Sequence, residues 1–432
     1  MQVIILAAGR GTRMGPLTDT LAKPMLPVAD RPLVAHAATA AVDAGADELI
    51  FTVGYGEDQL RAYFGDHYAG VPVTYAVQKE QLGTADAVAA AADAITGPFA
   101  VLNGDSLYRT GDLKKLFASA PQIGAINVDN PSNYGVLVTD VDDVVTDVEE
   151  KPDQPSSNLI NAGAYTFTAD TLALLDVPKS QRGEHELTDV LDRLIERAEL
   201  GCVTFDDWLD VGRPWELLAA NERRLPGGSP RSESPGPACS TRLVRSDPSM
   251  TSDGGHDVAT DMGSPMGAPP KPAIHPSATI GEEVVVEPGV SVGPGVVIEG
   301  RVLLRTGCSV GPNAYVRGAT LLDEDSHVGH AVEIKNSVLM RGATVGHLSY
   351  VGDSILGENV NFGAGTVVAN LRHDGEPVSL TVKTKRLSTG RRKFGAVVGP
   401  NAMTGIQTGL NPGVTLSANA RTAPGENVSR DR

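Results

Sequence analysis

The sequence predicts an α/β domain with a largely parallel sheet, joined by a polar segment to a parallel β-helix. Three observations carry this prediction. Short β-rich runs alternate with helical patterns over residues 1–225, Pro, Gly, Ser and Asp dominate residues 226–272, and a six-residue apolar period begins at Ile274. A chain of 432 residues is long enough for two or more domains.

The first region has the alternation that is typical of a helix-covered parallel sheet. Helical patterns lie at Leu33–Ala44 and Thr84–Ile95. The expected strands are Gln2–Leu6, Glu48–Val53, Val73–Ala76, Phe99–Leu102 and Gly124–Val128. Ligands of such sheets bind at the carboxyl ends of the strands, so we expect a site there.

The last region repeats an apolar residue every six positions. One register comprises Ile274, Ile280, Val286, Val292, Ile298, Leu304, Val310, Val316, Leu322, Val328, Ile334 and Met340. The phase then slips, and the pattern resumes at Tyr350, Leu356, Phe362 and Val368, and after a longer excursion at Val398, Thr404, Leu410, Leu416, Thr422 and Val428. This period predicts a hexapeptide β-helix over residues 273–432, with these side chains pointing into the prism. Residues 226–272 are expected to be a flexible linker.

Charge and cysteine usage restrict the class of function. The 36 basic and 53 acidic residues give a net charge of -17, which argues against nucleic-acid binding because that needs clustered positive charge. No apolar run approaches the ~20 residues of a membrane span, and the N-terminus opens with a strand rather than a signal peptide. The three cysteines lack CxxC spacing. We expect a cytoplasmic protein that binds neither nucleic acid nor membrane.

The loop after the first strand has the composition of a phosphate-binding segment. It reads Leu6-Ala7-Ala8-Gly9-Arg10-Gly11-Thr12-Arg13-Met14. Small residues and glycines let backbone N–H groups approach phosphate oxygens closely. Arg13 and a second cation, Lys23, would neutralise charge on those phosphates during catalysis. A structural tight turn is the simpler alternative for the Gly-x-Gly alone.

The whole string, followed by Lys23-Pro24-Met25, resembles the sugar-1-phosphate nucleotidyltransferase family. The resemblance implies a Rossmann-like nucleotidyltransferase domain over residues 1–225. Its expected nucleotide contacts are Leu6, Ala8, Gly9, Gly11, Thr12, Gln78, Gly83 and Thr84. The Gln78 amide suits a pyrimidine edge, which favours UTP (or dTTP), although an ordinary strand-end residue is the alternative.

The same resemblance extends to a metal site and a sugar pocket. Asp105 and Asp210 match the family's metal-binding aspartates, and paired carboxylates suit Mg²⁺. The expected ligands of the sugar-1-phosphate are Gly135, Glu150, Lys151 and Asn161. Glu149 is an alternative to Glu150 as the sugar ligand, and a surface charge cluster is the simpler interpretation of both.

Two strings in the β-helix, His347–Ser354 and Asn359–Thr366, closely resemble the acetyltransferase domain of the bifunctional enzymes that make UDP-N-acetylglucosamine. The resemblance implies a left-handed β-helix in which His347 is the general base, a role that suits a neutral imidazole. It also implies substrate contacts by Arg317, Lys335, Tyr350, Asn361 and Asn370, and acetyl-CoA contacts by Ala364 and Lys393.

The excursion after Val368 is unusually basic for so acidic a chain. It carries Lys383, Lys385, Arg386, Arg391, Arg392 and Lys393. We expect these residues to meet the phosphates of coenzyme A or of the sugar, with a solvated loop as the alternative. The excursion is longer and more basic than in bacterial members of the family and resembles the archaeal type.

Together these features favour a bifunctional enzyme. It would acetylate glucosamine-1-phosphate with acetyl-CoA, then transfer uridylate from UTP to the product and release pyrophosphate. The main alternative is a monofunctional glucose-1-phosphate uridylyl- or thymidylyltransferase with a structural or regulatory β-helix. A non-catalytic sensor of nucleotide sugars is a third possibility, against which Arg13, Lys23, Asp105 and Asp210 argue. The resemblance also implies a homotrimer.

Overall fold

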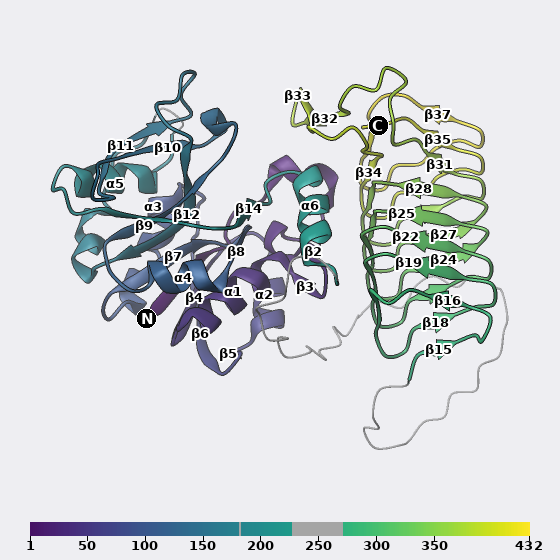
Figure 1. Ribbon diagram of the computed structural model, residues 1–432, viewed down its shortest axis with the longest axis horizontal. Coiled ribbons are helices and arrows are strands. Elements are labelled where there is room, and N and C mark those ends of the chain that lie inside the picture. The colour runs from purple at the N-terminus through teal and green to yellow at the C-terminus, as the bar shows by residue number, and fades with distance from the viewer. Residues whose placement is uncertain (181–182, 227–270) are drawn as a thin grey trace.

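The computed structural model describes residues 1–180, 183–226 and 271–432. An α/β domain, purple to teal in Figure 1, lies alongside a tall stack of short strands, green to yellow. All but a few residues of the predicted linker 226–272 lie outside the described residues. Within the described ranges, no helix is both long and apolar enough to cross a membrane.

The sheet of the α/β domain is parallel in one half and largely antiparallel in the other. Its main strand order is β11-β10-β12-β7-β1-β4-β6-β5, and β9 pairs with both β12 and β13. The parallel half comprises β1 (Gln2–Leu6), β4 (Glu48–Val53), β6 (Val71–Val77) and β7 (Phe99–Asn103). The remaining strands are β5 (His67–Tyr68), β9 (Gln122–Asn127), β10 (Gly135–Thr139), β11 (Val145–Glu150), β12 (Leu159–Phe167) and β13 (Gly201–Thr204).

The mixed sheet is a refinement of the predicted parallel one. Parallel neighbours need a crossover of a dozen or more residues, and the predicted helix Leu33–Ala44 lies in the crossover between β1 and β4. Strands β10 and β11 are joined by a short turn instead, so they pair antiparallel. The alternation of strands and helices therefore predicts correctly only the parallel half of the sheet, formed by β1, β4, β6 and β7.

Helices cover the sheet and connect its strands. α1 matches its predicted bounds and ends at Gly45, whose φ of 110° is the left-handed conformation that commonly terminates helices. The predicted helix Thr84–Ile95 is interrupted after Ala89 and ends in a short 3₁₀ turn, η3 (Ala92–Ala94). The helices are α1 (Leu33–Ala44), α2 (Glu57–Phe64), α3 (Thr84–Ala89), α4 (Thr110–Leu116), α5 (Leu187–Ile195) and α6 (Pro214–Arg224). Short 3₁₀ segments are η1 (Thr12–Thr18), η2 (Lys23–Met25), η4 (Pro131–Asn133) and η5 (Ala169–Leu174).

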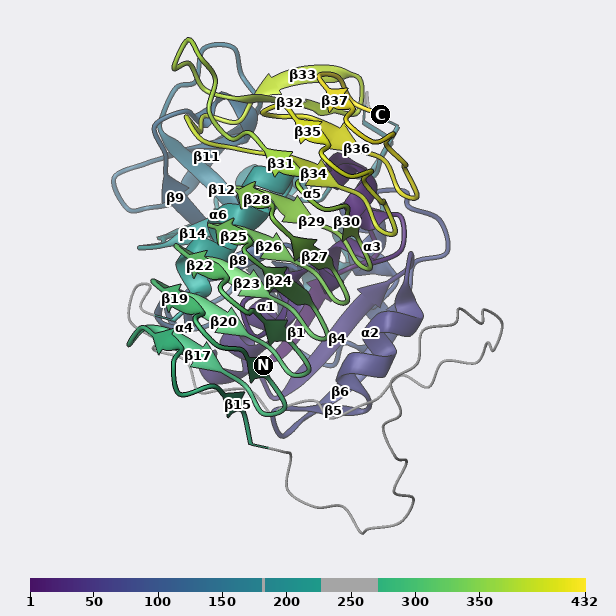
Figure 2. The same ribbon diagram turned by 90° about the vertical axis from the view of Figure 1, so that its right-hand side faces the viewer.

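The second body is the predicted left-handed parallel β-helix, a prism with three parallel sheets as its faces (Figure 2). The first face comprises β15 (Ala273–Ile274), β18 (Ser291–Val292), β21 (Ser309–Val310), β24 (His327–His330), β27 (Thr344–His347) and β30 (Asn361–Phe362). The second face comprises β16 (Thr279–Ile280), β19 (Val297–Glu299), β22 (Tyr315–Arg317), β25 (Glu333–Lys335), β28 (Tyr350–Gly352), β31 (Val367–Val368), β35 (Gly409–Leu410) and β37 (Asn427–Val428). The third face comprises β17 (Val284–Val286), β20 (Val302–Leu304), β23 (Thr320–Leu322), β26 (Val338–Leu339), β29 (Ile355–Leu356), β34 (Val397–Val398) and β36 (Thr415–Leu416).

The apolar period is correct over most of the prism but wrong at two positions. After Ile334 the inward side chain is Leu339, one residue earlier than the strict period. Met340 therefore lies outside the prism, buried against the α/β domain, and Tyr350 lies on the second face while its neighbour Val351 points inward. Two steps of only five residues, from Ile334 to Leu339 and from Val351 to Leu356, shift the phase, so a rigid six-residue count misassigns both residues.

The third face of the β-helix packs against the α/β domain through an apolar cluster. From the α/β side it contains side chains of η1 and α6, and from the β-helix side it contains outward residues of the third face. Its members include Met14, Leu17, Leu217, Leu218, Leu321, Val338, Met340, Ile355, Leu380 and Val397. Leu380 belongs to a hairpin of β32 (Ser379–Val382) and β33 (Lys385–Ser388), formed by the basic excursion. The β-helix thus packs against η1, the segment that directly follows the glycine-containing loop.

Candidate active sites

The glycine-containing loop after β1 lies at the carboxyl end of the parallel strands, as expected. Gly11 has φ 69°, and a Cβ there would lie 2.5 Å from the Lys23 Cβ, so only glycine fits. A Cβ on Gly9, by contrast, would meet nothing within 4 Å. The loop therefore packs tightly against Lys23 on one side and is open beside Gly9, where phosphate oxygens can approach backbone N–H groups.

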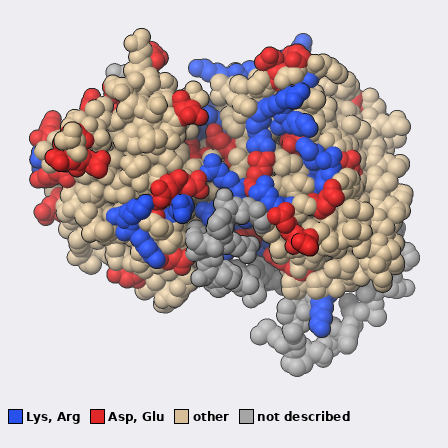
Figure 3. All heavy atoms as spheres, viewed as in Figure 1, with Lys and Arg blue, Asp and Glu red and all other residues tan. Residues whose placement is uncertain are grey.

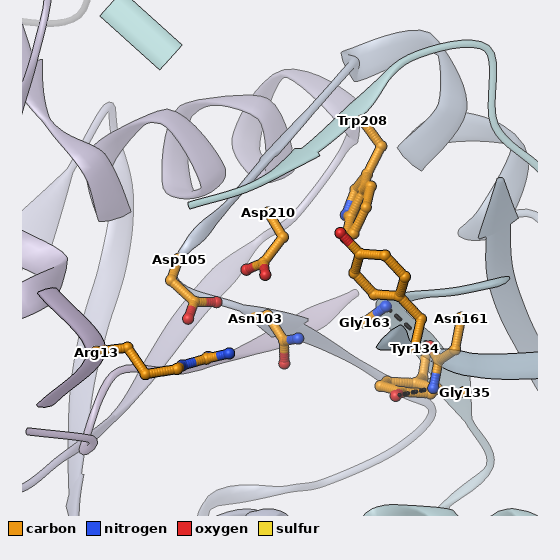
Figure 4. A pocket seen from close by; sticks show the side chains of 10 residues that line it. Arg13, Asn103, Asp105, Tyr134, Gly135, Asn161, Gly163, Trp208 and Asp210 are labelled. Atoms are coloured by element: carbon orange, nitrogen blue, oxygen red, sulfur yellow. Dashed lines mark hydrogen bonds between the residues drawn. The ribbon is translucent and has the colours of Figure 1, made fainter. Parts of the chain in front are cut away.

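The two predicted metal ligands come from separate segments that pair. β14 (Trp208–Asp210) runs antiparallel to β8 (Ser106–Tyr108). Asp210, the last residue of β14, lies opposite Ser106, the residue that follows Asp105. The Val211 N–H donates to the carbonyl of Asp105 at 2.9 Å. Figure 4 shows both carboxylates at one cavity, with the Arg13 side chain reaching toward it. The structure thus brings together Arg13, Asp105 and Asp210.

The pKa values of these two carboxylates are shifted in opposite directions. Burial by itself would raise the pKa of Asp105, but Lys23 and Arg13 beside it hold that pKa below its usual value. The Lys23 ammonium donates a short hydrogen bond to Asp105. Burial and the neighbouring Asp105 charge raise the pKa of Asp210. Two half-buried carboxylates that repel one another fit a hard cation such as Mg²⁺, which commonly takes one or two protein carboxylates plus substrate phosphates.

The whole cavity is about 200 Å³ in volume, and aromatic rings form one of its walls. The rings of Tyr134 and Trp208 meet edge to face with centroids 5.8 Å apart. Gly135 and Asn161 also line this cavity, and the Asn161 amide donates to the Tyr165 hydroxyl at 2.8 Å. An edge-to-face aromatic wall with adjacent amide groups can hold a sugar ring and bind its hydroxyls.

The structure distinguishes between the two adjacent glutamates. Glu149 accepts hydrogen bonds from the backbone and side chain of Ser156. Glu150 lies opposite Gly135 in the β10–β11 ladder, and its Oε2 is 3.4 Å from where a Gly135 Cβ would be. Lys151, which lines the neighbouring part of the cleft, forms an ion pair with Glu150 at 2.5 Å. The position of Glu150 favours it over Glu149 as the sugar ligand.

The predicted base-reading residues are held by internal contacts. The buried Gln78 amide nitrogen donates to the Gly83 carbonyl at 3.0 Å and to Asp86 at 2.8 Å. Thr84 accepts from the Leu187 N–H at 2.8 Å. Gly83 has φ 123°, and a Cβ there would be 2.2 Å from the His185 carbonyl oxygen. Gln78 therefore organises the turn that follows it.

Sequence reasoning missed several residues near the cavity as candidates. Asn103 and Trp208 line it, Arg213 lines the adjoining cleft, and Glu216 bonds to both Arg213 and the Gly212 N–H. Burial, together with the nearby Asp210 charge, raises the pKa of Glu216 to about 7. The signal was present, because each lies within a few residues of Asp105 or Asp210 in the sequence.

The second predicted site lies mostly on the second face of the β-helix. Arg317 and Lys335 occupy the same register position on neighbouring coils. Arg317 donates twice to Glu333, at 2.9 and 2.7 Å, and the Asn370 amide donates to the Tyr350 hydroxyl at 3.2 Å. Arg317, Lys335, Tyr350 and Asn370 therefore form one polar array.

The remaining predicted residues lie around this array. His347 is exposed at the end of β27, at the corner between the first and second faces, and its carbonyl accepts from the Gly365 N–H beside Ala364. Lys393 precedes Phe394, whose backbone N–H donates to the carbonyl of Asn370 in the array at 3.0 Å. Asn361 lies in β30, on the first face. The structure therefore separates Asn361 from the four residues of the array.

The fold and the first cavity define a nucleotidyltransferase that carries a hexapeptide β-helix. Residues 2–225 match the family described as nucleotidyl transferase, and residues 298–390 match the family described as "GMPPB C-terminal domain". The bifunctional protein GlmU of Methanocaldococcus jannaschii is 36% identical over 433 residues, which cover all of this chain and 95% of that protein. A bifunctional sugar-1-phosphate nucleotidylyltransferase/acetyltransferase of Sulfurisphaera tokodaii is 33% identical and is covered over 98% of its length.

A shorter relative matches about half of the chain. The UTP–glucose-1-phosphate uridylyltransferase AglF of Haloferax volcanii is 37% identical over 52% of this chain and 96% of its own length. The full-length relatives also cover the β-helix. The chain belongs to the family of bifunctional sugar-1-phosphate nucleotidylyltransferases/acetyltransferases.

Proposed function

We propose that the α/β domain transfers uridylate from UTP to N-acetylglucosamine-1-phosphate. One observation carries this proposal. Arg13, Asp105 and Asp210 surround a cavity that continues to Tyr134 and Asn161, which places the charged groups between an open phosphate loop and a sugar-sized pocket. The family of bifunctional relatives supports the same reaction class.

The transfer needs no covalent enzyme intermediate. A phosphate oxygen of the sugar-1-phosphate attacks the α-phosphorus of UTP, the bond to the β-phosphate bridging oxygen breaks, and pyrophosphate leaves. Arg13 and Lys23 stabilise the negative charge that accumulates on the phosphates, and the N–H groups of the loop at Gly9 to Thr12 orient them. Asp105 and Asp210 would hold Mg²⁺, which supplies further charge neutralisation when bound.

On the β-helix we propose acetyl transfer from acetyl-CoA to the amine of glucosamine-1-phosphate. His347 takes a proton as the nitrogen attacks the thioester carbonyl, and coenzyme A leaves as the thiol. Arg317 and Lys335 bind the sugar phosphate, and Tyr350 and Asn370 contact the sugar and the acyl group. Ala364 and Lys393 contact acetyl-CoA. The acetylated sugar phosphate is then the substrate of the α/β domain, and we propose a cytoplasmic homotrimer as the functional assembly.

One variant, assayed separately for each reaction, tests which site carries out which reaction. The full chain is supplied separately with glucosamine-1-phosphate plus acetyl-CoA, or with N-acetylglucosamine-1-phosphate plus UTP. Free thiol and pyrophosphate report the two reactions. His347→Asn is expected to abolish thiol release while pyrophosphate release stays near the wild-type rate. Wild-type protein that releases pyrophosphate but no thiol would instead identify a nucleotidyltransferase with a structural β-helix.

A further inference from the structure

Glu222, in the last turn of α6, is an α/β-domain residue whose carboxylate contacts the β-helix. The Arg391 guanidinium donates to both of its oxygens, with Nη1 3.0 Å from Oε2. The Asn336 amide donates to Oε1 at 2.7 Å, and Arg301 donates to the Glu222 backbone carbonyl. Both partners in the Glu222–Arg391 ion pair are about three-quarters buried, with side chains 24% and 23% exposed. A fork-shaped, partly buried charge pair fixes geometry as well as adding energy.

The contacts of Glu222 continue to the proposed acetyltransferase site. The Asn336 amide also donates to Oδ1 of Asp353 at 2.9 Å. The Asp353 carboxylate is nearly fully buried, and its Oδ2 accepts from the Lys335 ammonium at 2.7 Å and from the Asn370 amide at 2.5 Å. Asp353 therefore sets the positions of two substrate-binding side chains, and its other oxygen is anchored through Asn336 to Glu222.

Arg391 carries a second branch of the same network. The Arg391 backbone carbonyl accepts from the Val378 N–H at 2.8 Å. Two residues later, Lys393 forms an isolated antiparallel β-bridge with Leu371. The Lys and Arg side chains gather along the edge of the β-helix that faces the α/β domain (Figure 3). The Glu222–Arg391 pair thus also holds the segment that presents Lys393 to the acyl donor.

We propose that Glu222 is a positioning residue of the acetyltransferase site, although it belongs to the nucleotidyltransferase domain. This inference rests on the acetyl transfer proposed above. Loss of the Glu222 charge leaves the Arg391 charge partly buried without its counter-charge and weakens the hydrogen bond that anchors Asn336. Asp353 keeps its bonds to Lys335 and Asn370 but is held less firmly on its Asn336 side, so Lys335 is less well fixed in the position in which it meets the sugar phosphate. His347 is outside this network, so the chemical step itself is spared.

The test uses the full chain and the dependence of thiol release on glucosamine-1-phosphate. Glu222→Gln is expected to raise the KM for this substrate by about tenfold and to change kcat by less than about twofold, as expected for lost ground-state binding. Asn336→Gly interrupts the same network without backbone strain, because Asn336 has φ 49°. The double variant is expected to be no worse than the more severe single variant, since both act through one chain of contacts.

Glu358→Gln is the matched control. Glu358 also contacts the other domain, accepting from the Thr20 hydroxyl at 3.1 Å, but it lies outside the network. The KM of the Glu358→Gln variant for glucosamine-1-phosphate is expected to stay at the wild-type value. Pyrophosphate release by every variant reports that the α/β domain is folded. An unchanged KM in both Glu222→Gln and Asn336→Gly, or equal shifts in Glu358→Gln, overturns the inference. Wild-type protein without thiol release overturns the proposed acetyl transfer on which it rests.

Discussion

Asp210 lies beside Asp105 because β14 pairs antiparallel with β8, and the residue after Asp210 donates its backbone N–H to the Asp105 carbonyl at 2.9 Å. Strand pairing therefore fixes the separation of two carboxylates that are far apart in the sequence. Their mutual repulsion contributes to the raised pKa of Asp210, while Lys23 holds the pKa of Asp105 low. A divalent cation bound by both carboxylates would relieve this repulsion.

Replacement of one of these carboxylates should separate the two activities. Asp105→Asn is expected to lower kcat for pyrophosphate release at least about a hundredfold, because charge stabilisation at the transferred phosphate is lost. Thiol release by the same protein should remain near the wild-type rate. Asp142→Asn, in an exposed turn of the same domain, is the control and should leave both rates unchanged. A normal rate of pyrophosphate release by Asp105→Asn would refute its proposed metal role.

The turn that carries the proposed base-reading residues should be intolerant of a side chain at Gly83. Gly83→Ala places a Cβ 2.2 Å from the His185 carbonyl oxygen at φ 123°, so we expect a loss of more than about 1 kcal/mol in unfolding free energy. The KM for UTP should rise as the turn shifts. Gly97→Ala, where a Cβ meets nothing within 4 Å, should leave both quantities near wild type. Chemical denaturation and steady-state kinetics measure the two effects.

The aromatic wall of the cavity should contribute to sugar binding. Trp208→Ala removes the ring that meets Tyr134, and we expect the KM for the sugar-1-phosphate to rise about tenfold with a smaller change for UTP. Trp208→Phe keeps an aromatic ring and should recover most of the affinity. Equal losses for both substrates in Trp208→Ala would show that Trp208 supports the fold of the domain rather than the sugar.

A buried histidine should make the α/β domain sensitive to acid. Burial, aided by the Arg224 charge, lowers the pKa of His36 to about 3, and its Nε2 lies 2.9 Å from the Val28 carbonyl oxygen. Well above pH 6.5, His36 is neutral in both the folded and the unfolded chain, so its protonation does not lower the free energy of unfolding there. Below that pH only the unfolded chain takes up the proton, which costs about 2 kcal/mol of stability by about pH 5.

His36→Gln removes this titration and keeps a polar side chain. Unfolding free energies measured between about pH 7 and pH 5 should fall less steeply for the variant than for the wild type. The comparison cancels the carboxylates that titrate in both proteins. Parallel pH profiles for the two proteins would show that His36 does not contribute to the acid sensitivity.

The sequence predicts most of the fold because its patterns are local and strong. The strand Gln2–Leu6 and the helix Leu33–Ala44 have the predicted bounds, since apolar periodicity and the glycine after the helix define them. The phase of the β-helix at Met340 and Tyr350 could not be read from a strict period. A shortened coil changes which residue points inward, and the burial of Met340 depends on packing against another domain.

The candidate sites were predictable where one short string carries the chemistry. The loop from Leu6 to Met14 and the pair Asp105 and Asp210 were found from their strings. Trp208 was missed because its role depends on contact with the ring of Tyr134, which is far away in the sequence. Glu222 was missed for a stronger reason, because its contacts with Arg391 and Asn336 exist only after the two domains have packed together.

The most direct test of a bifunctional enzyme follows one acetyl group through both reactions. Purified full-length protein is given glucosamine-1-phosphate, UTP, Mg²⁺ and acetyl-CoA labelled in its acetyl carbon, and mass spectrometry identifies the nucleotide sugar formed. We predict UDP-N-acetylglucosamine that carries the label, with thiol and pyrophosphate released in equal amounts. Unlabelled UDP-glucosamine as the product, with pyrophosphate but no thiol, would contradict the account.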